Sequence, residues 1–165
     1  MKVFSNSSPI MYLAKIEKLS LLKELFSKII IPKEVYEEVV EKGKEGGFLD
    51  SLRVEKAVKE GWIKINKENR EMEYFREIGT GESALISLAK KEKADLVLID
   101  DASARIIAES FGLNVKGTLY VLLLGCKNGI LNKKEVKELI KRLIDAGFRI
   151  SAEIYTDILD KVEKL

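Results

Sequence analysis

Short apolar runs alternate along the chain with segments of helical periodicity, and this alternation is what most constrains the fold. The runs lie at residues 2–4, 29–31, 62–65, 96–99 and 113–115, separated by amphipathic stretches. Strands that alternate with helices form a mostly parallel sheet with helices on both sides. The run 96–99 is apolar throughout, as is typical of a strand buried on both faces. We therefore expect an α/β fold, a three-layer α/β/α sandwich with a mostly parallel central sheet.

Turn and cap signals indicate where the helices begin and end. Ser8 followed by Pro9 predicts an N-cap with proline at the first helical position, and Asp50 predicts the cap of a helix that runs to Gly61. Residues 43–47 predict a loop, and residues 68–78 form a charged amphipathic stretch. Further helices are expected from Thr80 onward and at 10–16, 21–26, 33–40, 102–111, 119–124, 133–146 and 152–162.

The composition excludes several classes of enzyme. The chain has 165 residues, one cysteine and no histidine. Its length suits one compact domain with a sizeable core. The single cysteine excludes an internal disulfide framework and any multi-cysteine zinc site, and the missing histidine excludes Ser-His-Asp and Cys-His triads. Catalysis would have to use carboxylates, hydroxyls, lysine, arginine or a bound metal. A net charge of +2 permits nucleic acid as a partner without indicating it.

Two further features of the composition bear on the protein's surroundings. Glutamine is absent while lysine and glutamate are abundant, a pattern that fits adaptation to high temperature. No apolar stretch approaches the ~20 residues of a membrane-spanning helix, and no signal-like segment opens the chain. We expect a soluble cytoplasmic protein that does not associate with a membrane.

Polar side chains follow two of the predicted strands. Asn6 follows the first, and Asp100 and Asp101 follow the strand at 96–99. In a parallel sheet, sites form beyond the carboxyl ends of the strands. Glu82 lies at the flank of an apolar helix face, where a carboxylate needs a cationic partner. An amide and several carboxylates without histidine describe an oxygen-only site for Mg²⁺ or Mn²⁺, which suits phosphodiester hydrolysis.

Each of these residues also has a purely structural interpretation. Asp101 can cap the helix that starts at Ala102 and pair with Arg105 four residues later. Asn6 can form an Asx-turn, and Glu82 can favour the helix dipole. On the helix after Pro32, Glu37 and Glu38 flank the apolar stripe almost symmetrically. Helical periodicity does not choose between these two glutamates.

A different interpretation concerns residues 79–84. They match a variant of the glycine-rich dinucleotide fingerprint, with Asp100 as the acid that would bind the ribose. That fingerprint must follow a strand, whereas residues 72–78 have charged, helix-like patterning. We therefore expect no dinucleotide site.

Four segments resemble the PIN-domain superfamily, and more narrowly a prokaryotic branch related to the VapC toxins of toxin-antitoxin pairs. They are Val3-Phe4-Ser5-Asn6-Ser7-Ser8-Pro9-Ile10, Ile31-Pro32-Lys33-Glu34-Val35-Tyr36-Glu37-Glu38-Val39, Gly81-Glu82-Ser83-Ala84-Leu85 and Leu98-Ile99-Asp100-Asp101-Ala102-Ser103-Ala104-Arg105. The resemblance covers residues 1–128 and implies a PIN-like domain there. Residues 129–165 look like that branch's C-terminal helical extension, packed on the same domain.

The resemblance implies a Mg²⁺- or Mn²⁺-dependent nuclease, and many PIN domains cleave RNA. Its four acidic positions fall on Asn6, Glu38, Glu82 and Asp100, which makes Glu38, Glu82 and Asp100 the implied catalytic residues. Asn6 stands where an aspartate is expected and removes one negative charge, for which Asp101 would compensate as a further metal ligand.

The resemblance also implies partners. The expected ones are RNA, an antitoxin protein and a second copy of the chain. The small polar residue of the first motif falls on Ser8, and Arg105, Lys116 and Lys127 are candidates to neutralise RNA phosphates. The alternative is a catalytically weak or inactive PIN-fold module that binds nucleic acid or protein, which the asparagine at position 6 favours.

Overall fold

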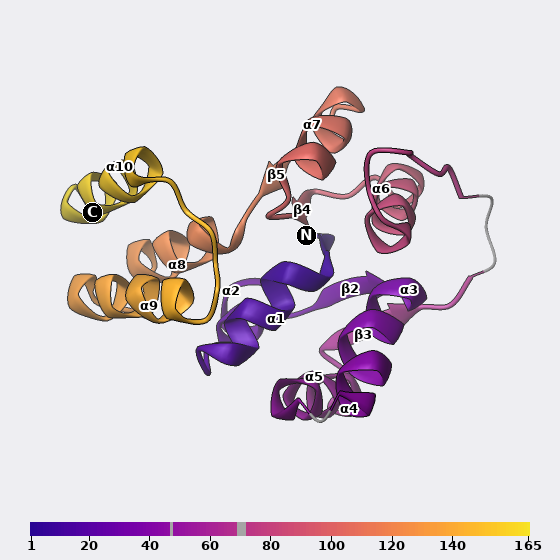
Figure 1. Ribbon diagram of the computed structural model, residues 1–165, viewed down its shortest axis with the longest axis horizontal. Coiled ribbons are helices and arrows are strands. Elements are labelled where there is room, and N and C mark those ends of the chain that lie inside the picture. The colour runs from indigo at the N-terminus through magenta and orange to yellow at the C-terminus, as the bar shows by residue number, and fades with distance from the viewer. Residues whose placement is uncertain (47, 69–71) are drawn as a thin grey trace.

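In the part of the chain that the structure describes, five parallel strands form one sheet at the centre of the molecule (Figure 1). The computed structural model describes residues 1–46, 48–68 and 72–165. Within them the strand order is β3-β2-β1-β4-β5, and each neighbouring pair is parallel. The strands are β1 (Val3–Ser5), β2 (Ile29–Pro32), β3 (Ile63–Asn66), β4 (Leu96–Leu98) and β5 (Val115–Lys116). The predicted α/β architecture is confirmed.

Helices connect the strands and complete the C-terminal part. Those before β4 are α1 (Ser7–Lys15), α2 (Ser20–Phe26), α3 (Lys33–Tyr36), the π-helical η1 (Glu37–Glu41), α4 (Lys42–Glu45), α5 (Leu49–Lys59) and α6 (Thr80–Glu92). After β4 come α7 (Ala102–Ser110), α8 (Thr118–Lys127), α9 (Lys133–Asp145) and α10 (Ala152–Glu163). Of the helices in the described part of the chain, none has the length and apolar character needed to span a membrane.

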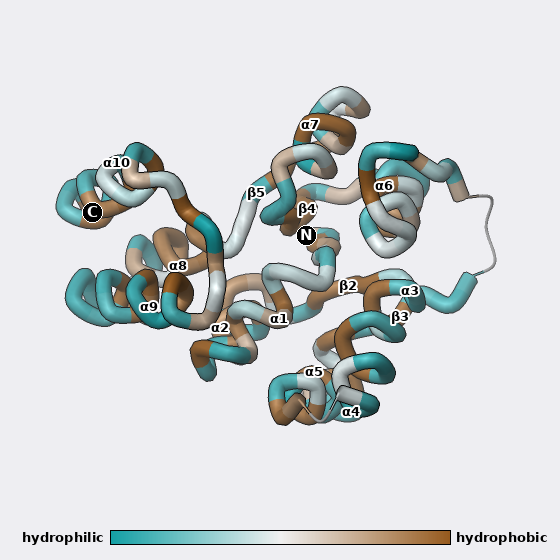
Figure 2. Tube along the Cα trace, viewed as in Figure 1, coloured by the Kyte–Doolittle hydropathy of each residue, from teal (hydrophilic) through white to brown (hydrophobic). Residues whose placement is uncertain are grey.

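The two faces of the sheet bury two separate sets of side chains. Val3 and Leu98 belong to the larger core cluster, which also contains residues of α1, α2, α5 and α8. Phe4 and Val97 point to the opposite face, where they join residues of α6 and α7. Because successive strand residues alternate between faces, a sheet with both faces covered needs such apolar strands. Figure 2 shows the brown, hydrophobic colour of β2 and β4 at the centre, with teal stretches on the outer helices α4, α5 and α9.

The start of α1 differs from the prediction. The helix begins at Ser7 with Asn6 as its N-cap residue, so Ser8 is not the cap and Pro9 is not the first helical residue. The backbone N–H of Asn6 donates to the carbonyl of Leu98 at 2.9 Å. This bond keeps Asn6 in extended conformation at the sheet edge, and the next residue is the first that can turn into the helix.

The region before α5 also differs from the prediction. α5 follows Phe48 as its N-cap residue, and Asp50 lies in the first turn, where it pairs with Arg53 at 3.1 Å. A carboxylate in a first turn still stabilises the helix through its dipole. The predicted loop at 43–47 is wrong over residues 43–45, which belong to the helix α4, and Gly47 lies outside the described residues.

Residues 72–79 form neither helix nor strand, so the helix-like pattern before α6 was misleading. The backbone N–H of Glu73 donates to Ser87 Oγ and that of Phe75 to Ser83 Oγ, both at 3.2 Å. Side chains of α6 therefore satisfy donors that a helix would satisfy internally. Residues 69–71 lie outside the described residues. With no strand at 72–79, residues 79–84 lack the context of a dinucleotide fingerprint.

The two C-terminal helices share the larger core. Val136, Ile140 and Leu143 of α9 and Ile158 and Val162 of α10 belong to the same cluster as the sheet residues. α9 begins with a capping box, in which Asn132 and Glu135 each accept a hydrogen bond from the other's backbone N–H. Residues 129–165 thus pack against the rest of the chain, while their boundary at residue 128 stays a prediction.

Candidate active site

Two of the predicted site residues lie at the carboxyl ends of neighbouring central strands. Asn6 follows β1 directly, and Asp100 comes two residues after β4. The strands are held in register by the pairing of Ser5 with Leu98. Both polar side chains therefore leave the same edge of the sheet, where open parallel sheets bind their ligands.

The side chain of Asn6 is buried, with 2% of its surface exposed. Its Nδ2 donates to Glu82 Oε1 at 3.4 Å, a long hydrogen bond. Its Oδ1 is buried and accepts no hydrogen bond within the residues that the structure describes. A buried amide oxygen without a partner costs roughly 1–3 kcal/mol, so this atom is suited to meet a cation or a water donor. Its bond to Glu82 does not fit an Asx-turn, in which the side chain bonds to nearby backbone.

Glu82 lies in the first turn of α6, beside a glycine that leaves it room. A Cβ on Gly79 would lie 2.6 Å from Glu82 Oε2. The side chain is half-buried, as its place at the flank of the apolar face predicted. The dipole of α6 also favours a carboxylate here.

Glu38 reaches the same region from the π-helical segment η1. Its Oε2 accepts a hydrogen bond from Ser7 Oγ at 2.9 Å. A Cβ on Gly81 would lie 2.9 Å from that oxygen, so Glu38 lies against the start of α6. Helical periodicity did not choose between Glu37 and Glu38. The structure shows that Glu38 contacts both Ser7 and the first turn of α6.

Asp100 is held by a residue far along the chain. Its Oδ1 accepts from the backbone N–H of Thr118 and its Oδ2 from Thr118 Oγ1, both at 2.7 Å. A Cβ on Gly117 would lie 2.7 Å from Oδ1, so glycine is needed for this close approach. Burial raises the pKa of Asp100, and the hydrogen bonds from Thr118 and the charge of Arg105 oppose that shift.

Asp101 has the structural role that was one of its two interpretations from the sequence, that of a helix cap. It is the N-cap residue of α7, and its Oδ1 accepts from the backbone N–H of Ala104 at 2.8 Å. The residue is exposed. Arg105 donates to the carbonyl of Ile99 at 3.4 Å, on the side of Asp100.

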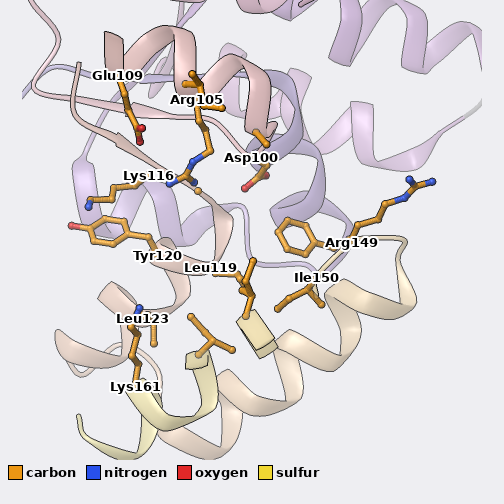
Figure 3. A pocket seen from close by; sticks show the side chains of 16 residues that line it. Asp100, Arg105, Glu109, Lys116, Leu119, Tyr120, Leu123, Arg149, Ile150 and Lys161 are labelled. Carbon is orange, nitrogen blue, oxygen red and sulfur yellow. The ribbon is translucent and has the colours of Figure 1, made fainter. Parts of the chain in front are cut away.

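The residues predicted to bind RNA are distributed over three places. Ser8 is half-buried in the first turn of α1. Arg105 and Lys116 line a cavity of about 680 Å³ that Asp100 also borders (Figure 3). The ammonium of Lys116 lies 5.5 Å from the centre of the Tyr120 ring. Lys127 is exposed in the last turn of α8.

The contacts divide the predicted site into two parts. Asn6 bonds to Glu82 in the first turn of α6 and Glu38 lies against Gly81 of the same turn, whereas the carboxylate of Asp100 is engaged by Thr118. Within residues 1–46, 48–68 and 72–165, no group of three or more acidic or cysteine side chains is arranged to hold a metal ion. Mg²⁺ is commonly bound through one or two carboxylates while it keeps several waters. A neutral oxygen such as Asn6 Oδ1 beside the carboxylate of Glu82 fits a site of that kind.

Sequence reasoning missed the residues that hold the carboxylates. Ser7 and Thr118 each donate to a carboxylate that lies far away in the sequence, and Gly81 and Gly117 leave space for the carboxylate oxygens. Gly117 and Thr118 directly follow a short strand. This position at a strand end was the only local feature that could have indicated their role in the site. No signal distinguished Ser7 from Ser8.

Comparisons with known proteins agree with this fold. A protein-family model described as PIN domain matches residues 2–164. The fold is similar to the solved structure of a PilT N-terminus domain protein from the hyperthermophilic archaeon Sulfolobus solfataricus P2. That likeness has a TM-score of 0.53 and 15% sequence identity, and covers 73% of this chain and 90% of that chain. At this identity the likeness concerns the fold alone. No curated protein matches the chain significantly.

Proposed function

This chain belongs to the PIN-domain family, a family of nuclease fold, and we propose that it hydrolyses RNA phosphodiester bonds with Mg²⁺ or Mn²⁺. The observation that carries the proposal is the buried Oδ1 of Asn6, which has no hydrogen-bond partner among the described residues, while the Nδ2 of the same amide donates to Glu82 Oε1. An oxygen in that position is a ligand of the kind that hard cations prefer.

Asn6, Glu38, Glu82 and Asp100 are the residues that would hold the metal. When bound, the ion would neutralise phosphodiester oxygens and lower the pKa of a water molecule. We leave Asp101 out of this set, because its carboxylate already caps α7.

The chain's own residues supply positioning in this proposal. Ser7 orients Glu38, and Thr118 orients Asp100 through two hydrogen bonds. These two bonds fix the direction in which the Asp100 carboxylate faces the metal. Arg105 lies on the same side and is placed to meet a phosphate oxygen.

We further propose that the protein acts as a VapC-like toxin held inactive by an antitoxin partner, and that it works as a homodimer in the cytoplasm. This part rests on the resemblance of the four sequence segments. Expression of the chain alone should arrest growth of a bacterial host, and expression of Asp100→Asn should not. Normal growth on strong expression of the soluble wild-type chain would contradict the toxin role and leave the nuclease proposal standing.

An RNA cleavage assay tests the nuclease proposal. Purified protein is incubated with single-stranded and structured RNA in Mn²⁺, Mg²⁺ or EDTA. We expect cleavage only with metal, and a loss of about 100-fold or more in Glu82→Gln and in Asp100→Asn. Glu138→Gln, a change of the same kind at an exposed residue of α9, serves as the control and should cleave like the wild type. Cleavage in EDTA, or full activity in Glu82→Gln, would contradict the proposed site.

One observation favours a second function, a non-catalytic RNA- or protein-binding module. Asn6 carries no charge, so the site is less negative than four acids would make it. Such a module would bind RNA without cleaving it in any divalent metal. The same assay, read with a binding measurement, separates the two functions.

A further inference from the structure

The cavity beside Asp100 lies where the C-terminal helices meet the sheet. Residues of α7, β5, α8 and α10, together with residues 148–150, line its volume of about 680 Å³. Pockets for small ligands commonly measure about 300–1,000 Å³. Figure 3 shows Arg105 reaching from α7 towards Asp100, with Lys116 beside it and Leu119 and Ile150 on the side of the C-terminal helices. The cavity therefore opens directly next to a residue of the candidate active site.

The wall of this cavity is largely aliphatic. Leu119 and Leu123 of α8 and Ile150 contribute to it. Two further lining residues on opposite helices, Ile106 of α7 and Ile154 of α10, are 68% and 51% exposed. Large aliphatic side chains that are exposed around one cavity indicate a surface that buries an apolar group of a ligand.

The rim of the cavity is positively charged. The cationic lining residues are Arg105, Lys116, Arg149 and Lys161, and the acidic ones are Asp100 and Glu109, so four positive charges face two negative ones. Arg149 points outward at the edge of the cavity (Figure 3). An apolar wall with a cationic rim fits a ligand that has a flat apolar part and regularly spaced anionic groups.

We propose that this cavity receives an unpaired nucleotide of the RNA substrate, next to the phosphate that is cleaved. The base would lie against Leu119, Tyr120 and Ile150, and the flanking phosphates would meet the cationic rim. The inference rests on the proposed function, because Asp100 borders both the cavity and the candidate active site. Because the cavity adjoins the proposed site of RNA cleavage, we favour RNA over an acidic peptide as its ligand. A base within a duplex is stacked and paired, so the cavity would select single-stranded RNA.

Binding in EDTA tests this inference without cleavage. The probe is a fluorescein-labelled single-stranded RNA of about ten nucleotides, within the usual range for such sites, and the same RNA annealed to its complement. Fluorescence anisotropy should show that the single strand binds several-fold more tightly than the duplex. Ile154→Trp, which fills the cavity from an exposed position, should weaken binding of the single strand roughly tenfold, the effect of one lost stacked base.

A second variant tests whether the cationic rim of the cavity contacts RNA phosphates. Arg149→Ala should weaken binding of the single strand several-fold and lower its salt dependence by about one phosphate contact. Lys141→Ala removes an exposed charge from α9 and is the matched control, which should bind like the wild type. Circular dichroism confirms that each variant is folded.

Three results would overturn the inference. They are equal binding of single strand and duplex, wild-type binding by both Ile154→Trp and Arg149→Ala, and loss of binding to an acidic amphipathic peptide in these variants while RNA binding is unchanged. Failure of the nuclease proposal has a different signature. A wild type that never cleaves RNA, but whose RNA binding is lost in the cavity variants, would retain the cavity as an RNA site.

Discussion

Asn6 contributes a neutral oxygen where a carboxylate would add charge beside Glu82. Asn6→Asp would place two carboxylates in contact, because the present partners lie 3.4 Å apart and the residue is buried. In EDTA we expect the free energy of unfolding to fall by on the order of 1–3 kcal/mol. In Mn²⁺ we expect tighter metal binding and recovery of much of that loss.

Urea unfolding and calorimetric titration of Mn²⁺ measure the two effects of Asn6→Asp. Asn114→Asp, at an exposed position before β5, is a control for the added charge. Unchanged Mn²⁺ affinity in Asn6→Asp would place the metal elsewhere.

Asp100 should make stability depend on pH. Burial raises its pKa above the ordinary value of 3.8, so the native state holds this proton more tightly than the unfolded chain. The native state therefore loses stability as the pH rises from 3.8 through the raised pKa, and regains it as the pH falls. Asp100→Asn removes the titration. In EDTA the stability of the wild type relative to this variant should decline across that range.

Urea unfolding at a series of pH values checks the dependence. Asp101→Asn, at the neighbouring exposed cap, is the control and should retain the decline seen in the wild type. A difference between wild type and Asp100→Asn that does not vary with pH would show that Asp100 titrates normally in the native state.

At the scale of single elements, the start of α6 combines helix stability with the geometry of the site. A methyl group at Gly81 would come within 2.9 Å of Glu38 Oε2, an atom at the end of a flexible side chain. Gly81→Ala should therefore move the Glu38 carboxylate and break its bond to Ser7 without unfolding the helix. Because alanine favours helix over glycine by about 1 kcal/mol, stability should stay equal or rise, while Mn²⁺ affinity falls several-fold.

Thermal unfolding and Mn²⁺ titration of Gly81→Ala separate these effects. Lys91→Ala, on the exposed face of the same helix, is the control, since an exposed ion pair such as the one to Glu68 contributes little. If Gly81→Ala binds Mn²⁺ as tightly as the wild type, Glu38 is not part of the metal site.

Element positions were largely predictable, because they depend on local patterns. The strand at 96–99 and the helices at 133–146 and 152–162 were identified from apolar periodicity within a residue or two. Helix starts were less predictable. The start of α1 is decided by a hydrogen bond from Asn6 to Leu98 on another strand, and the stretch before α6 is held by serine side chains of that helix.

At the scale of the whole molecule, one core joins the C-terminal helices to the sheet. Ile140 of α9 is fully buried, and the single tryptophan, Trp62, lies before β3 in the same cluster. Ile140→Ala should lower the free energy of unfolding by about 2–5 kcal/mol. Because the core is shared, far-ultraviolet circular dichroism and Trp62 fluorescence should report one coincident transition.

Ile144→Ala is the matched control for Ile140→Ala. Ile144 lies on the same helix but is 39% exposed, so its truncation should cost about 1 kcal/mol or less. If circular dichroism of Ile140→Ala shows a loss of helix before the fluorescence of Trp62 changes, residues 129–165 unfold as a separate unit.

The α/β class, the parallel sheet and the polar side chains at its carboxyl edge were determined by the sequence alone, since periodicity and strand-end position are local properties. Only the tertiary structure decided which partners those side chains have. Ser7 meets Glu38 across 31 positions and Thr118 meets Asp100 across 18, contacts that depend on how distant helices pack against the sheet. The cavity that α10 completes beside Asp100 has the same origin, because its walls come from elements that no local pattern brings together.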